Sequence, residues 1–151
     1  MSSSMTTELS DAQLETLRGG CAGLLITVGE DRFPTTAFVW ALAASRETVR
    51  FGAEGSATLA NLKRERRASL QIIGSRNRVF LVKGRTRLAK PRLEAVPFES
   101  AMIALEVTEV KDQTWPEVQV RELAYEWISE RREEWRAIEQ AVYQELREWK
   151  E

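Results

Sequence analysis

The chain has 151 residues, 43% of them apolar and 30% charged, which is typical of one globular domain that buries a core. Its 22 Lys and Arg residues nearly balance 23 Asp and Glu residues, and the net charge of −1 argues against a general nucleic-acid binder. With no histidine and one cysteine, the sequence excludes Ser–His and Cys–His dyads, an intrachain disulfide and a zinc site of several thiolates.

The N-terminal residues show no targeting segment. Residues 1–9 are polar, are expected to form a frayed tail, and lack the apolar core of a signal peptide. The longest apolar run, FVWALAA, is too short to span a bilayer. We therefore expect a cytoplasmic protein that does not bind a membrane.

A short helix is predicted directly after this tail. Ser10 and Gln13 form an S-x-x-Q capping box, and Leu14 and Leu17 give the helix one apolar face. The pair Gly19-Gly20 is a typical helix end.

Short apolar runs separated by turn residues predict six strands. The expected strands cover residues 23–28, 33–44, 46–53, 68–73, 78–89 and 101–111. Pro34 fits at the beginning of a strand, where a missing N–H does least harm. Gly84, inside the fifth strand, indicates a bulge or a close contact.

A second short helix is predicted between the third and fourth strands. Ser56 is the expected N-cap, and Leu59 and Leu62 lie on the buried side. Lys63 begins a basic run near the end of this helix, where positive charge suits the helix dipole.

A long helical region is predicted for the C-terminus. Thr114 and Glu117 form a second capping box with Pro116 in the first turn, and a break near Ser129 is an option. One apolar stripe runs along this region and is expected to pack on the barrel or on a partner subunit. The stripe comprises Leu123, Trp127, Trp135, Ile138, Val142, Leu146 and Trp149.

The order of these elements predicts a mainly β (α+β) fold. Strands that follow one another without long crossovers form an antiparallel sheet, which we expect to roll into a barrel. The chain is expected to be one domain, with the barrel over about 22–112 and C-terminal helices over about 115–150.

Three strings in this order resemble the flavin-binding split-barrel family of pyridoxamine phosphate oxidase. They are TVGEDRFPTTAFVW, GSATLANLKRERRASL and NRVFLVKGRTRL, and the similar region runs from Leu24 to Lys111. The resemblance implies a six-stranded antiparallel split barrel, a homodimer, and FMN bound in the cleft between the subunits. The flavin phosphate would lie on the second and third predicted strands and the start of the short helix.

The phosphate site that the resemblance implies is only partly present. Ser56 matches the family's phosphate-binding serine, whereas the lysine two positions later is Thr58. The family's remaining phosphate ligands, an arginine, a lysine and a threonine, correspond to Ala37, Leu42 and Gly52. Pyridoxamine phosphate oxidation is therefore not expected.

The turn before the short helix could still hold an anion. It offers backbone N–H groups, the hydroxyls of Ser56 and Thr58 and the helix dipole, whereas the carboxylate of Glu54 opposes an anion. Positively charged side chains from elsewhere in the chain could also bind the anion. The candidates are Arg50, Lys63, Arg76 and Arg78.

Each candidate site residue also has a structural interpretation. Ser56 and Thr58 are suited to a helix cap. Trp40 could stack on a flavin ring, but it is also typical of a core or a dimer interface. Arg78 and Arg85 face either an anion or solvent, and Cys21 is more typical of a small packed hydrophobe than of a reactive thiol.

Two functions follow as hypotheses. The first is an FMN-dependent oxidoreductase of unknown substrate that acts as a homodimer and uses the chemistry of the flavin. The second is a non-catalytic binding or regulatory split barrel that has lost FMN or holds another cofactor, a deazaflavin or haem.

Overall fold

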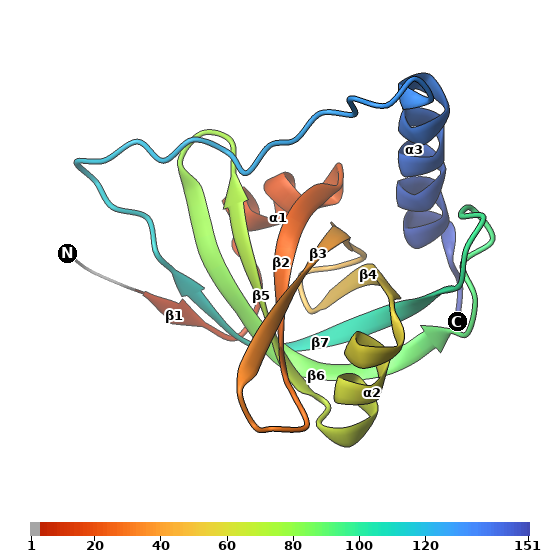
Figure 1. Cartoon of the computed structure of the whole chain (residues 1–151). Coiled ribbons are helices and arrows are strands. Elements are labelled where there is room, and N and C mark those ends of the chain that lie inside the picture. Colours follow the sequence, from red (N-terminus) through yellow and green to blue (C-terminus); the bar gives the residue numbers. More distant parts are fainter. Residues whose placement is uncertain (1–3) are drawn as a thin grey trace.

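The structure, a computed structural model, describes residues 4–151 as an antiparallel barrel with helices around it (Figure 1). In chain order the elements are β1 (Met5–Thr6), α1 (Asp11–Arg18), β2 (Cys21–Val28), β3 (Pro34–Ala43), β4 (Thr48–Glu54), α2 (Ser56–Arg64), β5 (Arg67–Gly74), β6 (Arg78–Lys90), β7 (Ser100–Asp112) and α3 (Arg132–Glu148). The strands form a ring in the order β7-β4-β3-β2-β5-β6, which the pairing of β6 with β7 closes. The predicted six-stranded antiparallel barrel is confirmed.

The barrel interior is filled by the side chains of one face of each strand. In β5, for example, Ala68, Leu70 and Ile72 are buried, and the residues between them are only partly covered. Phe51 of β4 and Phe80 of β6 are the largest side chains of this core.

The closure of the barrel depends on a bulge at Gly84. The register of β6 against β7 shifts between Lys83 and Gly84. A Cβ atom at Gly84 would lie 2.1 Å from the backbone oxygen of Glu106, so only glycine allows this approach. The predicted bulge or close contact is confirmed.

A second apolar cluster joins α3 to the outside of the barrel. Val142 and Leu146 of α3 are buried against Leu42 of β3, with Leu93 of the loop between β6 and β7 beside them. The C-terminal part of the predicted stripe therefore packs on the chain's own barrel. Among residues 4–151, no helix is both long and apolar enough to cross a bilayer.

Residues 115–131 are not helical, and that part of the prediction is wrong. The backbone of this segment bonds to the barrel: the N–H of Val120 donates to Asn77 Oδ1 at 2.8 Å, and that of Leu123 donates to Ile73 O at 2.9 Å. These contacts replace the local bonds of a helix, so the segment crosses the barrel as an extended strap (Figure 1).

The predicted capping box at Thr114 is absent for a related reason. The N–H of Thr114 donates to Asp112 Oδ1 at 2.8 Å, which makes a local turn at the end of β7. The helix begins only at Arg132, after a turn in which the N–H of Arg131 donates to Ser129 Oγ at 3.0 Å.

The predicted frayed tail is also wrong for its last five residues. Met5 pairs with Lys111 in β1, and the buried Leu9 donates its N–H to Arg46 O at 2.9 Å. Residues 1–3 of the predicted tail lie outside the described residues. The capping box of α1 is confirmed, because Gln13 N donates to Ser10 Oγ at 3.2 Å and Ser10 N donates to Gln13 Oε1 at 2.9 Å.

Candidate functional site

A cavity of about 320 Å³, called here the aromatic cleft, lies on the outer face of β3 and β4. The strap, the loop between β6 and β7, and α3 complete its walls. Among its lining side chains are Phe38, Trp40, Leu93, Tyr125, Trp127 and Val142. Such an apolar wall with few polar groups suits a flat, largely apolar ligand.

Aromatic rings hold one wall of the cleft in place. Trp40 and Trp127 meet edge to face with ring centroids 6.1 Å apart, and Tyr125 meets Trp127 in the same manner at 5.9 Å. Trp135 of α3 stacks on Trp127 at 5.3 Å with 11° between the ring planes. These contacts fix Trp127 between the barrel and α3.

The cleft has few polar groups. Glu54, at the end of β4, places an exposed carboxylate at its edge. Ser100 Oγ is engaged, because it donates to Ala53 O at 3.3 Å. The indole N–H of Trp127 is buried and has no acceptor among residues 4–151.

The helix α2 begins beside Glu54, but Ser56 is not its N-cap. The N-cap is Gly55, with a φ of 83°, and no side chain caps the helix. Glycine adopts this φ without strain, which lets the chain leave β4 and enter the helix in one residue. Ser56 is exposed and is the first residue of α2, so the predicted cap is wrong by one position.

The chain resembles known proteins in its fold but not in its sequence. No family model matches the sequence, and no curated protein does. Among solved structures, an F420 reductase matches with a TM-score of 0.56 and 18% identity, over 68% of this chain and 98% of that chain. A candidate 5-nitroimidazole antibiotic resistance protein from Bacteroides thetaiotaomicron matches with a TM-score of 0.50 and 7% identity, over 74% and 89% of the two chains.

The chain has the split-barrel fold. The likeness shows the fold that the sequence strings predicted. At these identities it does not fix a ligand.

The split barrel does not fit the phosphate of FMN at the positions that the resemblance implies. Leu42 is 1% exposed because α3 covers it. At Gly52 a Cβ would lie 2.8 Å from Leu93 Cδ1, so the loop between β6 and β7 fills the space of a threonine there. The position of Leu42 is thus closed by α3, and a side chain at Gly52 would require Leu93 to move.

The predicted site residues do not gather at one point. Trp40 lines the aromatic cleft and also packs against the α3 cluster. Ser56 and Thr58 lie at the start of α2, outside the cleft lining, and Lys63 is exposed about 10 Å further along the helix. Arg78 lines a different cavity.

This second cavity, of about 820 Å³, lies between α1, the ends of β2 and β5, the strap and α3. Arg78 Nη1 is buried there with no acceptor among residues 4–151, whereas Arg76 pairs with Glu15 at 3.1 Å. Carboxylates from the strap and α3 line the same cavity, including Glu122 and Glu139. Its charge is therefore mixed. Arg85, the other strand arginine considered, is exposed on β6.

Cys21 lies at the edge of the second cavity and behaves as a packed hydrophobe. Burial and the nearby charge of Glu122 raise the pKa of its thiol to about 11. The thiolate is then scarce at neutral pH, which removes the nucleophilic form.

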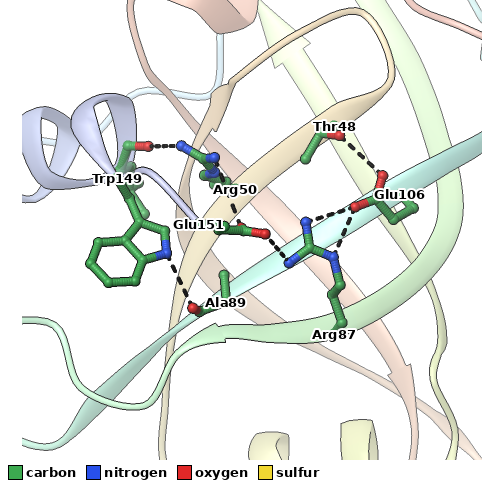
Figure 2. Close-up of polar contacts among 8 residues, drawn as sticks. Thr48, Arg50, Arg87, Ala89, Glu106, Trp149 and Glu151 are labelled. Carbon is green, nitrogen blue, oxygen red and sulfur yellow. Dashed lines mark hydrogen bonds and ion pairs between the residues drawn. The ribbon is translucent and has the colours of Figure 1, made fainter.

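Arg50 shares the outer face of β4 with Glu54, but the C-terminus holds its guanidinium (Figure 2). Arg50 Nη1 donates to Leu146 O at 3.0 Å, and its Nη2 lies 3.9 Å from a carboxylate oxygen of Glu151. Arg87 pairs with Glu151 and, at 2.9 Å, with Glu106. The cations on this face therefore bind the chain's own end.

A largely buried ion pair between Lys90 and Glu145 also holds α3 on the barrel. Lys90 Nζ lies 2.7 Å from Glu145 Oε2, and the two side chains are only 14% and 13% exposed. Glu145 also accepts from the backbone N–H groups of Glu94 and Ala95, at 2.9 and 2.8 Å. The Lys90 ammonium lies 4.7 Å from the ring centroid of Trp149, so one side chain joins β6 to two points of the C-terminus.

Proposed function

We propose that this split barrel binds a flat heteroaromatic ring of the flavin or deazaflavin type in the aromatic cleft. The observation that carries the proposal is the position of the cleft: it lies on β3 and β4 beside the start of α2, where the resemblance places the phosphate end of a flavin. The likeness of the fold to an F420 reductase supports a ring of this type.

Such a ring would supply hydride or electron transfer when bound, which requires no protein nucleophile. The chain's own residues would bind and orient it. Trp40 and Trp127 offer ring faces and edges. The FMN-dependent oxidoreductase is the narrower form of this proposal.

The second candidate is a non-catalytic binding or regulatory protein. It is favoured by the covered position of Leu42 and by the close approach of Leu93 to Gly52, because both argue against an FMN phosphate at these positions. A haem is a weaker variant, because the sequence has no histidine to serve as an axial ligand.

Riboflavin tests the ring site directly. We expect it to bind and to quench tryptophan fluorescence, and we expect Trp127→Ala to weaken binding about 10-fold. Stacking on an aromatic side chain is worth roughly 1–3 kcal/mol per base, and 1.4 kcal/mol is a factor of about ten. Trp115→Ala is the matched control, since Trp115 is 53% exposed and lies outside the cleft lining. Equal losses in both variants, or no binding by the wild type, would contradict the ring site.

A homodimer is the second part of the proposal. Apolar side chains remain exposed around the mouth of the cleft, with Phe38 64% exposed and Ile128 of the strap 89% exposed. A second copy of the chain that covers them would remove this surface from water. Light scattering at micromolar concentration should therefore give about twice the chain mass of 17.2 kDa. A single species at the chain mass over that range would reject the dimer.

A further inference from the structure

We infer that the aromatic cleft selects ring ligands without a phosphate, so that it takes riboflavin or another uncharged ring–polyol compound in preference to FMN. The inference rests on the proposed ring site and specifies its ligand class. It follows from the charges around the cleft, from the helix start beside it and from the space at the implied phosphate positions.

The charge at the cleft is negative. Among the described residues that line it, Glu54 is the only side chain that is charged at neutral pH. The carboxylate of Glu54 repels a phosphate, which carries about 1.5–2 negative charges at neutral pH. The same carboxylate accepts hydrogen bonds from hydroxyl groups, so a neutral polyol chain gains a partner where a phosphate meets a like charge.

The cations on the neighbouring face already have partners, although Arg50 Nε is buried and has none among residues 4–151. Arg50 donates to Leu146 O and lies near Glu151, Arg87 pairs with Glu106 and Glu151, and Lys90 pairs with Glu145. Recruiting one of them for a phosphate would release the end of α3 from the barrel. These cations therefore already bind residues at the chain's own C-terminus.

The start of α2 does not offset the repulsion between Glu54 and a phosphate. An anion there would gain from the helix dipole, but Glu54 directly precedes the N-cap Gly55 and already places a negative charge at that end. Ser56 and Thr58 offer hydroxyls, but the basic residues of α2, Lys63 and Arg64, lie at the other end of the helix.

The test is a comparison of riboflavin with FMN by calorimetry at low salt and at 1 M NaCl. The two ligands differ only by the phosphate. We expect riboflavin to bind about 10-fold more tightly than FMN at low salt. The difference should shrink at high salt, because the Debye length falls from about 10 Å at 0.1 M to about 3 Å at 1 M.

Two variants test whether Glu54 causes the preference for riboflavin over FMN. Glu54→Gln should bring FMN close to riboflavin and change riboflavin little, whereas Glu117→Gln, a control on the strap outside the cleft lining, should leave the preference as it is. Equal or tighter binding of FMN by the wild type would overturn the inference and leave the ring site standing. If that tighter binding is lost in Arg78→Ala, the phosphate lies in the second cavity instead. Absence of binding for both ligands would overturn the ring site together with the inference.

Discussion

Replacing Glu145 with alanine is expected to lower the free energy of unfolding by roughly 3 kcal/mol, because removal of one partner leaves a buried charge uncompensated. Lys90 would lose its carboxylate, and the N–H groups of Glu94 and Ala95 would lose their acceptor. Urea denaturation measures the change. Glu133→Ala, which removes an exposed carboxylate paired with Arg136, is the control and should cost less than about 1 kcal/mol.

The same carboxylate should give the unfolding free energy a pH dependence. Burial raises the pKa of Glu145, but the hydrogen bond from Lys90 and those from the two backbone N–H groups lower it by more, so the pKa lies below the usual value of 4.5. A lowered pKa stabilises the folded state above the unfolded-state pKa, and this contribution is lost as the pH falls through the folded-state pKa. Between pH 5 and lower values, the wild type should therefore lose more stability than Glu145→Gln. Parallel curves for the two proteins would show that the pair is not formed.

Substitution of Gly84 by alanine is expected to destabilise the barrel by about 3 kcal/mol or to prevent folding, since overpacking against a backbone costs typically 1–3 kcal/mol and occasionally more. The added Cβ would lie 2.1 Å from the oxygen and 2.8 Å from the carbonyl carbon of Glu106, at the bulge where β6 and β7 close the ring. Neither backbone atom can move without breaking the pairing of these strands.

Gly19→Ala is the matched control for this prediction. Gly19 has a φ of −84°, and no atom lies within 4 Å of an added Cβ. The substitution should be neutral or should stabilise by up to about 1 kcal/mol, because alanine reduces the entropy of the unfolded chain. A thermal melt of Gly84→Ala that coincides with that of the wild type would show that the bulge relaxes at no cost.

The barrel was predictable because its signals are local. In β4 and β5, buried residues alternate with residues that are only partly buried or exposed, so a period of two predicts the strand and its core residues, as Leu70 and Ile72 illustrate. Strand ends agree within two residues, and the bulge at Gly84 follows from a glycine inside an apolar strand.

The candidate site was less predictable, because its walls come from distant parts of the chain. Trp40 was a candidate from its strand alone, but no pattern in the sequence indicated that Trp127 or Leu93 would line the same cleft. The apolar stripe that contains Trp127 was interpreted as helix. A clue was available in the aromatic residues of the strap, which lie among turn-forming and charged residues rather than in a continuous helical pattern.

By itself, the sequence determined the antiparallel strands, the cap of α1 and the chemistry that the chain lacks, because composition, strand periodicity and capping depend only on neighbours in the chain. The split form of the barrel was implied by the family resemblance. The tertiary structure decided the rest. Residues 115–131 had helical patterning, yet bonding to Asn77 and Ile73 keeps them extended across the barrel. The ionic partners of Arg50 and Lys90 were likewise fixed only when α3 packed on Leu42. Charge pairing and cleft shape depend on which distant segments of the chain meet, and the periodicity of the sequence does not indicate these contacts.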